Sequence, residues 1–361
     1  MGWLYDTSVA LSEEQKLVRR QTIDLYACIA HYSALVPPLV LLLVRLVRRA
    51  APLWSPWARR SSPDGHGRYA EVPRSPIAKA HRRDASGSVT VRWTRLRWWL
   101  CDDVYFRGAH WGRREEWLLG FAWALWLLAL CVMDTGTDYL HLTKRFGAIA
   151  VSQLPIQFLL ALKALNPFAF AFHSSHEDVN RYHRVLGRIV YGLLILHALF
   201  YNYFFLVAGI WRKRFFALIV FLGVVAFAAM SALTTTSLVR VRQYSYRLFF
   251  ITHLLAAILV PVLIFFHAPS ARLYLVETLL IFGLDLAVRK MTTVTSASSF
   301  EVVRGTNLVK ISSAIPLRKL ANFKARPGSH VYLNVPPRSR PATNRAVFDF
   351  LFNPFTCAAG P

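Results

Sequence analysis

Acidic side chains are scarce in this sequence, and its cysteines lack the spacing of a binding or cross-linking motif. The 361 residues include 19 Asp and Glu against 43 Lys and Arg, a net charge of +24. Neither CxxC nor paired spacing relates the four cysteines, which argues against a zinc site and a disulfide framework; they are Cys28, Cys101, Cys131 and Cys357. The dinucleotide-binding motif GxGxxG is absent, and with it the usual sequence sign of a nucleotide-binding βαβ unit.

The N-terminus also lacks a targeting pattern. MGWLYDTSVALSEEQKLVRR does not have the basic, then apolar, then small-residue order of a cleaved signal peptide. We therefore expect the first apolar segment to stay in place as an uncleaved anchor.

Long runs of hydrophobic residues are abundant in the sequence. Hydrophobic residues make up 55% of the chain, which is too high for an ordinary soluble protein and favours a polytopic helical membrane protein. We expect seven spans, of which the second and seventh carry the weakest signal, the last because it contains Glu277 and Asp285. The expected spans are Leu25–Val47, Trp117–Met133, Phe146–Leu165, Ile189–Ala208, Phe215–Leu233, Phe249–His267 and Leu273–Val288.

The positive charge follows membrane topology. With seven spans and an external N-terminus (residues 1–24), the arginine-rich segment 48–116 and the later basic clusters all fall on the cytoplasmic side, as the positive-inside rule requires. Trp211–Arg214 (WRKR) is the exception. This distribution accounts for the charge without nucleic-acid binding, which we exclude as a function. Within the basic segment, Ala51–Ser88 is rich in Pro, Arg, Ser and Gly and is expected to be disordered.

The residue pattern changes after the last expected span, from long apolar runs to alternating apolar and polar residues. A helical membrane domain is predicted over 117–290, and residues 296–361 alternate in the manner of β-strands, as in SFEVVRGTNLVKISSA and GSHVYLNV. The chain is therefore expected to combine a membrane bundle with part of a water-soluble β-domain.

Four histidines in the apolar segments share one interval. His183 and His197 are fourteen positions apart, as are His253 and His267. Fourteen residues are just under four helical turns, so both rings of one helix face nearly the same way, about 21 Å apart along the axis. Helices four and six run in the same direction in the seven-span topology, which brings His183 level with His253 on the inner side and His197 level with His267 on the outer side.

Imidazoles are costly in hydrocarbon unless they bind something. Each level pair can hold one flat metal macrocycle between the two helices, so we predict two haems stacked across the bilayer. Nitrogen on both faces of the iron leaves no vacant position and favours electron transfer. Arg184 and Arg188 can pair with haem propionates or can be ordinary positive-inside residues. His31 is interpreted as a hydrogen-bonded packing residue, and His141 is a candidate for contact with an external substrate.

Three stretches carry a resemblance to a known family. RFGAIAVSQLPIQFLLALKALNPFAF, YHRVLGRIV and RLFFITHLL resemble the third span and the two haem helices of the fungal ferric/cupric reductases, the metalloreductase branch of the ferric reductase–NADPH oxidase superfamily. The similarity runs from about Lys144 to the C-terminus and leaves out the segment from Ala51 to Trp111.

The resemblance implies an electron path as well as a fold. It implies that the four histidines are axial haem ligands and that ARPGSHVYLNVP and NPFT begin a ferredoxin-reductase-type FAD-binding β-barrel, with NADPH as the donor. Phe355 and Thr356 match the family's flavin-contacting Phe and Thr, whereas Asn353 stands where the family has His. The sequence ends shortly after this motif, and we expect a truncated chain without the NADPH-binding domain.

The expected function is transfer of electrons through two haems to extracellular Fe³⁺ or Cu²⁺ chelates, in support of metal uptake with a permease or oxidase partner. The plasma membrane is the expected location, with the vacuolar membrane as the alternative. An oxidase that makes superoxide is the alternative within the same fold. A transporter with proton-relay histidines is the alternative of another class, favoured by Glu277 and Asp285.

Overall fold

The computed structural model describes residues 5–7, 11–54, 85–306, 308–317, 330–336, 339 and 353–356. The chain divides into two compact units, residues 1–285 (the membrane unit) and residues 286–361 (the C-terminal unit).

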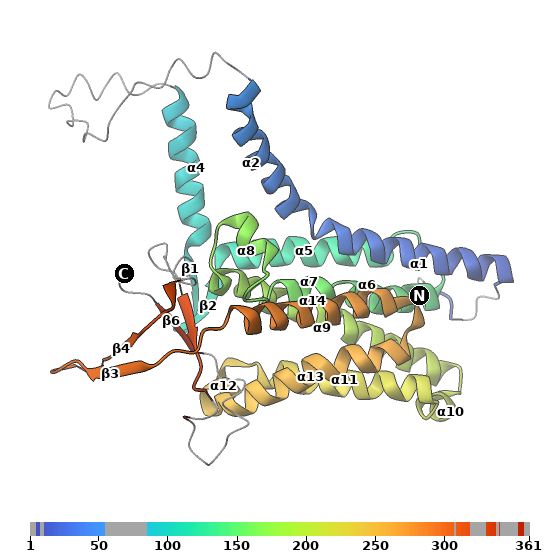
Figure 1. Ribbon diagram of the computed structural model, residues 1–361. Coiled ribbons are helices and arrows are strands. Elements are labelled where there is room, and N and C mark those ends of the chain that lie inside the picture. Colours follow the sequence, from blue (N-terminus) through green and yellow to red (C-terminus); the bar gives the residue numbers. More distant parts are fainter. Residues whose placement is uncertain are drawn as a thin grey trace. The chain divides into compact units, whose positions relative to one another are not determined.

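The membrane unit is a bundle of helices with one short β-hairpin (Figure 1). Its elements are α1 (Glu13–Ser33), α2 (Val36–Trp54), α4 (Ala85–Cys101), β1 (Asp103–Phe106), β2 (Ala109–Arg113), α5 (Arg114–Val132), α6 (Tyr139–Ser152), α7 (Leu154–Leu159), α8 (Pro167–Phe172), α9 (His176–Val207), α10 (Trp211–Phe215), α11 (Leu218–Thr236), α12 (Val239–Tyr244), α13 (Tyr246–His267), the 3₁₀ turn η2 (Pro269–Ala271) and α14 (Arg272–Thr292), whose last turns belong to the C-terminal unit.

Four of these helices, α5, α9, α11 and α13, are each long and apolar enough to cross a membrane, and the bent pair α1–α2 makes a fifth candidate. They fit the helical membrane bundle that the composition predicts. The other two expected spans are helical but fall outside this criterion. The third is divided between α6 and α7, and the seventh corresponds to α14, which carries two acidic residues and the basic pair Arg289 and Lys290.

The first expected span differs most from its prediction. The helix begins twelve residues earlier than Leu25, at Glu13, where Ser12 and Gln15 form a capping box. It then bends by 44° between α1 and α2. Pro37 and Pro38 follow the start of α2 directly. Since proline cannot donate a backbone hydrogen bond to the preceding turn, a bend at this point breaks few helix hydrogen bonds.

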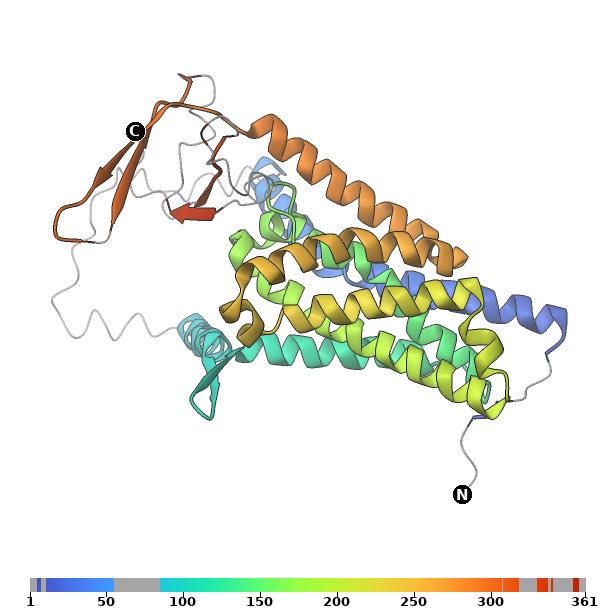
Figure 2. The ribbon, with the colours of Figure 1, turned by 90° about the horizontal axis from the view of Figure 1, so that it is seen from below.

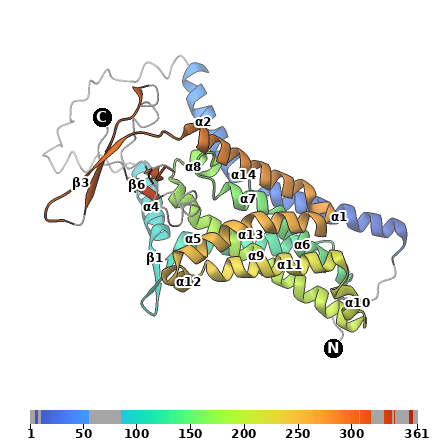
Figure 3. The same cartoon turned by 60° about the horizontal axis from the view of Figure 1, so that its bottom comes forward.

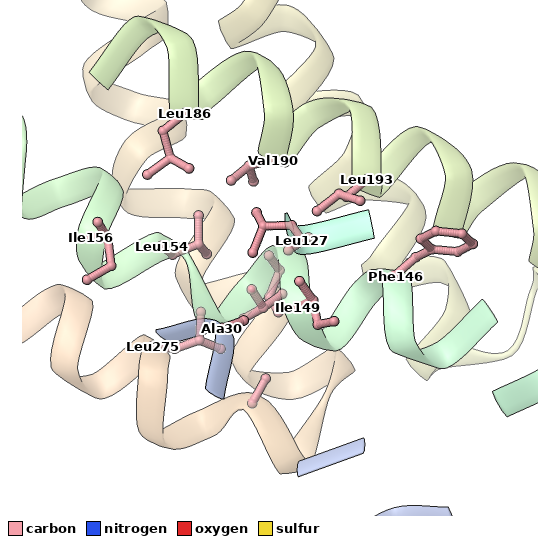
Figure 4. Packing of buried hydrophobic residues seen from close by; sticks show 14 of the residues in the cluster. Ala30, Leu127, Phe146, Ile149, Leu154, Ile156, Leu186, Val190, Leu193 and Leu275 are labelled. Carbon is pink, nitrogen blue, oxygen red and sulfur yellow. The ribbon is translucent and has the colours of Figure 1, made fainter. Parts of the chain in front are cut away.

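Helix α6 lies at the centre of the membrane unit. Eleven of its fourteen residues are buried, and it packs against α1, α5 and α9. Phe146 and Ile149 of α6 belong to one continuous apolar cluster with Leu127 of α5 and Leu193 of α9 (Figure 4). The helices that carry the four histidines are therefore packed around one shared core.

Helices α9, α11 and α13 run side by side along the length of the bundle (Figures 2 and 3). Helix α11 packs against α13 along most of its length and also contacts α9. Ser175 caps α9 and Ser245 caps α13, each accepting a hydrogen bond from the backbone N–H three residues on. Ser175 lies eight residues before His183, and Ser245 lies eight residues before His253.

The segment 48–116 contains more regular structure than the sequence predicts. Residues 55–84, most of the stretch expected to be disordered, lie outside the described residues, but α4 and the β1–β2 hairpin occupy Ala85–Arg113. The hairpin turns through Arg107 and Gly108, both with positive φ, and the φ of +75° at Gly108 suits a residue without a side chain.

In the C-terminal unit, the described strands form two antiparallel pairs. β3 (Ser298–Val302) pairs with β4 (Val309–Ser313), with Phe300 opposite Ile311. β5 (His330–Leu333) pairs with β6 (Asn353–Thr356), with Val331 opposite Phe355. These strands lie within the expected β-domain of residues 296–361.

Candidate functional site

The four histidines predicted to pair do lie in two pairs between α9 and α13. The ring centroids of His183 and His253 (the inner pair) are 6.1 Å apart, and those of His197 and His267 (the outer pair) are 6.5 Å apart. Since His183 faces His253 and His197 faces His267, α9 and α13 run in the same direction. Both helices are continuous between their two histidines, so the pairs are separated by about 21 Å along the bundle.

Each of the four rings has a hydrogen-bond partner for Nδ1. The acceptors are the backbone carbonyl of Gln157 for His183 (2.9 Å), that of Thr143 for His197 (2.8 Å), that of Ile219 for His267 (2.7 Å) and the hydroxyl of Ser237 for His253 (3.3 Å).

These partners determine the tautomer of the rings. A carbonyl can only accept, so Nδ1 carries the proton in His183, His197 and His267. The Ser237 hydroxyl donates its own proton to the carbonyl of Leu233 at 2.7 Å and can accept from His253. All four rings therefore present an unprotonated Nε2, as is typical of metal-ligating histidine. Nε2 of His183 also lies 3.4 Å from the side-chain amide nitrogen of Gln157, so a metal ion there would replace that contact.

The spacing within each pair fits one metal ion held from both sides. A metal–nitrogen bond of about 2 Å on each side, with about 1 Å from each Nε2 to its ring centre, separates the two ring centroids by about 6 Å. The separations of 6.1 and 6.5 Å agree with this value. Two ligands per ion leave the four equatorial positions to a macrocycle, as in haem.

Arg184 and Arg188 are exposed on α9, next to His183 and about one turn beyond it. Arg242 on α12, assigned from the sequence only to a basic cluster, lies at the same end. Its guanidinium is 5.7 Å from the ring centre of Phe249, which is itself 5.2 Å from the ring of His253. The Nε atom of Arg242 is buried without a hydrogen-bond partner among the described residues. Three cations are thus available near the inner pair.

The other polar residues singled out from the sequence have partners inside the protein. His31 is buried, and its Nδ1 donates to the carbonyl of Ser152 at 2.9 Å while Nε2 lies 3.5 Å from Glu277. His141 is buried, with Nε2 3.2 Å from Nη2 of Arg145. Asp285 accepts two backbone hydrogen bonds from the loop after α7.

The flavin motif is described only in its backbone. Asn353, Phe355 and Thr356 lie on β6, paired with β5, and their side chains fall outside the described residues. Their proposed contacts with FAD stay predictions.

Sequence reasoning missed the residues that hold the rings. Ser237 and the carbonyl of Gln157 carry no motif that would mark them. Gly147 and Gly223 each lie four residues after the residue whose carbonyl accepts from a histidine ring. This spacing cannot be recognised in the sequence, because it has to be known which helix the histidine packs against.

Comparison with known proteins gives one family. Residues 146–264 match the family described as "Ferric reductase like transmembrane component". The chain is 30% identical over 243 residues to "Probable metalloreductase AIM14" of Meyerozyma guilliermondii, covering 66% of this chain and 48% of that protein. It is 27% identical over 220 residues to "Ferric/cupric reductase transmembrane component 2" of Schizosaccharomyces pombe, covering 60% and 36%. The chain thus spans half or less of the length of the curated relatives it matches.

Proposed function

The chain belongs to the fungal ferric reductase family. From this premise we propose that it transfers electrons. It carries electrons from cytosolic NADPH and FAD across a membrane to ferric or cupric chelates on the other side. The observation that carries the proposal is the presence of two histidine pairs, at 6.1 and 6.5 Å, at two depths between the same two helices.

The inner and outer pairs would each hold one haem b through Nε2. Bound there, haem supplies one-electron transfer, and with nitrogen on both faces its iron has no open position for oxygen. The chain's own contribution is to keep Nδ1 protonated and hydrogen-bonded, which fixes the direction of each ring and raises the basicity of Nε2. Helices α9 and α13 set the distance between the rings.

Cations at one end of the site fit the charged edge of a haem. Arg184 and Arg188 remain candidates for pairing with the propionates of the inner haem, and the buried, unpartnered Nε of Arg242 adds a third. A buried guanidinium nitrogen without an acceptor is costly, so a carboxylate there would stabilise it.

The direction of transfer follows from charge. The basic segment 48–116, the arginines in the first turns of α9 and the cluster before α13 favour the cytoplasm for the inner pair. The N-terminal segment and the outer pair then face the opposite side, where the metal chelate is reduced. We propose the plasma membrane as the location, with the vacuolar membrane as the alternative, and a permease or oxidase as the partner in metal uptake.

The C-terminal unit supplies the start of the flavin site in this proposal. Phe355 would pack against the isoalloxazine ring and Thr356 would reach the flavin edge, with Asn353 in place of the family's histidine. Binding of FAD by this chain and NADPH as the electron donor are part of the proposal.

Haem content of the full-length chain tests the function. Purified protein supplemented with haem should contain two haems b, and replacement of His183, His197, His253 or His267 by alanine should lower this to one. His31→Ala is the matched control, because His31 is also a buried helix histidine but faces Glu277 instead of a second ring; it should keep two. A colourless protein, or four histidine variants that all retain two haems, contradicts the proposal.

The choice between metal reduction and superoxide production needs a second measurement. Proteoliposomes that contain dithionite inside should reduce an impermeant ferric chelate outside, with little superoxide trapped in parallel. Dominant superoxide yield would favour the oxidase alternative.

A further inference from the structure

The outer histidines lie unusually close to the backbone of neighbouring helices. His197 donates from Nδ1 to the carbonyl of Thr143 on α6, and four residues later comes Gly147. A Cβ atom on Gly147 would stand 2.6 Å from Cε1 and 2.7 Å from Nδ1 of His197. No real Cβ approaches a neighbour so closely, so the ring position requires glycine.

The same arrangement occurs at the second outer histidine. His267 donates from Nδ1 to the carbonyl of Ile219 on α11, and four residues later comes Gly223. A Cβ there would again stand 2.6 Å from Cε1 and 2.7 Å from Nδ1, now of His267. Helices α6 and α11 therefore each present to one outer ring a backbone carbonyl and, four residues later, a glycine.

Helix geometry explains the spacing of four. The carbonyl of residue i already accepts from the N–H of residue i+4, so a second donor must approach it from outside the helix, beside the side chain of residue i+4. When that residue is glycine, an imidazole can lie against the backbone there and share the carbonyl.

Glycine inside a helix is unfavourable relative to alanine. Not every helix glycine here has such a reason. Gly192 on α9 and Gly283 on α14 have no atom within 4 Å of the place where a Cβ would stand. These two give an internal contrast with Gly147 and Gly223.

The inner pair is held differently. His253 donates to the side chain of Ser237, and His183 donates to the carbonyl of Gln157 in the short helix α7. A Cβ on Gly187 would stand 2.9 Å from the side-chain nitrogen of Gln157, so this glycine lies against the partner of His183 and not against a ring. Among the described residues, a helix glycine in direct contact with a histidine ring is recorded for the outer pair alone.

We propose that Gly147 and Gly223 are positioning residues that set the orientation of the two outer rings and thereby the properties of the outer haem alone. The inference rests on the proposed haem-carrying function. With both rings seated on backbone carbonyls, the outer rings are nearly perpendicular, at 86°, whereas the inner rings are at 55°. The angle between two axial imidazoles governs the anisotropy of the low-spin ferric signal, so the outer haem should give the more anisotropic spectrum.

The test uses Gly147→Ala and Gly223→Ala in the full-length chain, with Gly192→Ala as the matched control. Haem content, a redox titration of the two haems and low-spin ferric EPR spectra are measured on each. Each test variant should lose the outer haem, halving the haem content, or shift the midpoint potential and EPR signal of the outer haem. The inner-haem signals should stay unchanged and serve as the measure of correct folding. The control should match the wild type in all three.

Two results would overturn the assignment. Unchanged outer-haem signals in both variants would mean that the rings do not depend on these glycines, and equal loss of both haems would mean that the glycines serve the fold as a whole. Failure of the function proposal looks different, because the wild-type chain itself would then bind no haem.

Discussion

Asp285 on α14 accepts a hydrogen bond from the backbone N–H of Ala164 at 2.9 Å, and the same oxygen accepts from Leu165 at 3.0 Å. The carboxylate is buried, with 3% of its surface exposed. An acid in an apolar helix suggests transport when it is read from the sequence alone. In the structure it satisfies two backbone groups that would otherwise be unpaired where the chain leaves α7.

Removal of this carboxylate should destabilise the membrane unit. Asp285→Ala removes the charged acceptor of the N–H groups of Ala164 and Leu165, which we expect to cost about 2–3 kcal/mol of unfolding free energy. Asp285→Asn keeps an oxygen at the same place and should cost less, about 1 kcal/mol. Thermal unfolding in detergent measures both, with haem content as a parallel reading. An asparagine variant as unstable as the alanine variant would mean that the charge itself is needed.

Arg145 should be among the most sensitive residues of α6. Its side chain is fully buried, donates to the carbonyls of Leu130 and Met133 at 3.0 and 3.3 Å, and lies 4.0 Å from the ring centre of Tyr26. Arg145→Ala removes these contacts together, and we expect a loss of about 3–5 kcal/mol in thermal or denaturant unfolding.

Lysine at the same position tests geometry against charge. Arg145→Lys keeps the charge but cannot reach both carbonyls with a planar fork, so it should lie between the wild type and Arg145→Ala in stability. The exposed Arg212, replaced by alanine, is the control and should leave the unfolding temperature unchanged. Full stability of the lysine variant would show that the paired carbonyl bonds contribute little.

The Ser237 hydroxyl should tune the inner haem. Ser237→Ala removes the acceptor for Nδ1 of His253, which lowers the basicity of its Nε2 and favours the reduced iron. We expect a higher midpoint potential for the inner haem and weaker haem retention, by roughly tenfold. Thr236→Val is the neighbouring control, since the Thr236 hydroxyl bonds only within its own helix. A shift of the outer haem instead would contradict the pairing of rings.

Neutral replacements should rank the three cations near the inner pair. A positive charge close to a haem favours its reduced form, so Arg184→Gln, Arg188→Gln and Arg242→Gln should each lower the midpoint potential of the inner haem. The residue that contacts a propionate should give the largest shift. Because the Nε of Arg242 is buried without a partner, we expect Arg242→Gln to shift the midpoint potential more than Arg188→Gln does. Redox titration at two salt concentrations checks this, since a screened surface charge would lose its effect at high salt.

The pairing of the histidines was predictable because it depends on periodicity and on two helices that run in the same direction. A fourteen-residue interval keeps two rings on one helix face wherever that helix packs, and two helices with the same interval can match at both positions. The resemblance of the surrounding motifs to the ferric reductases was confirmed by the family match over residues 146–264.

The features that the sequence did not reveal depend on contacts between helices. The third expected span divides into α6 and α7 at Gln153, and Pro155 lies in the first turn of α7. A proline in the sequence does not by itself predict whether a helix bends or ends. The role of Gly147 requires knowing that His197 approaches the carbonyl of Thr143. The early start of α1 was readable from the cap at Ser12, although charged residues after it concealed the helix from a search for apolar runs.

The contacts between α1 and the end of α6 have a consequence for protein engineering. His31 donates to the carbonyl of Ser152, and Gln153 returns a hydrogen bond to the carbonyl of Ala30 at 2.9 Å, so each segment caps the other reciprocally. A shortened version that starts at Arg114 would keep every histidine of the two pairs and still leave these groups at the end of α6 with no partner from α1. The amino-terminal helix is therefore better regarded as an integral wall of the helical bundle than as a detachable tether.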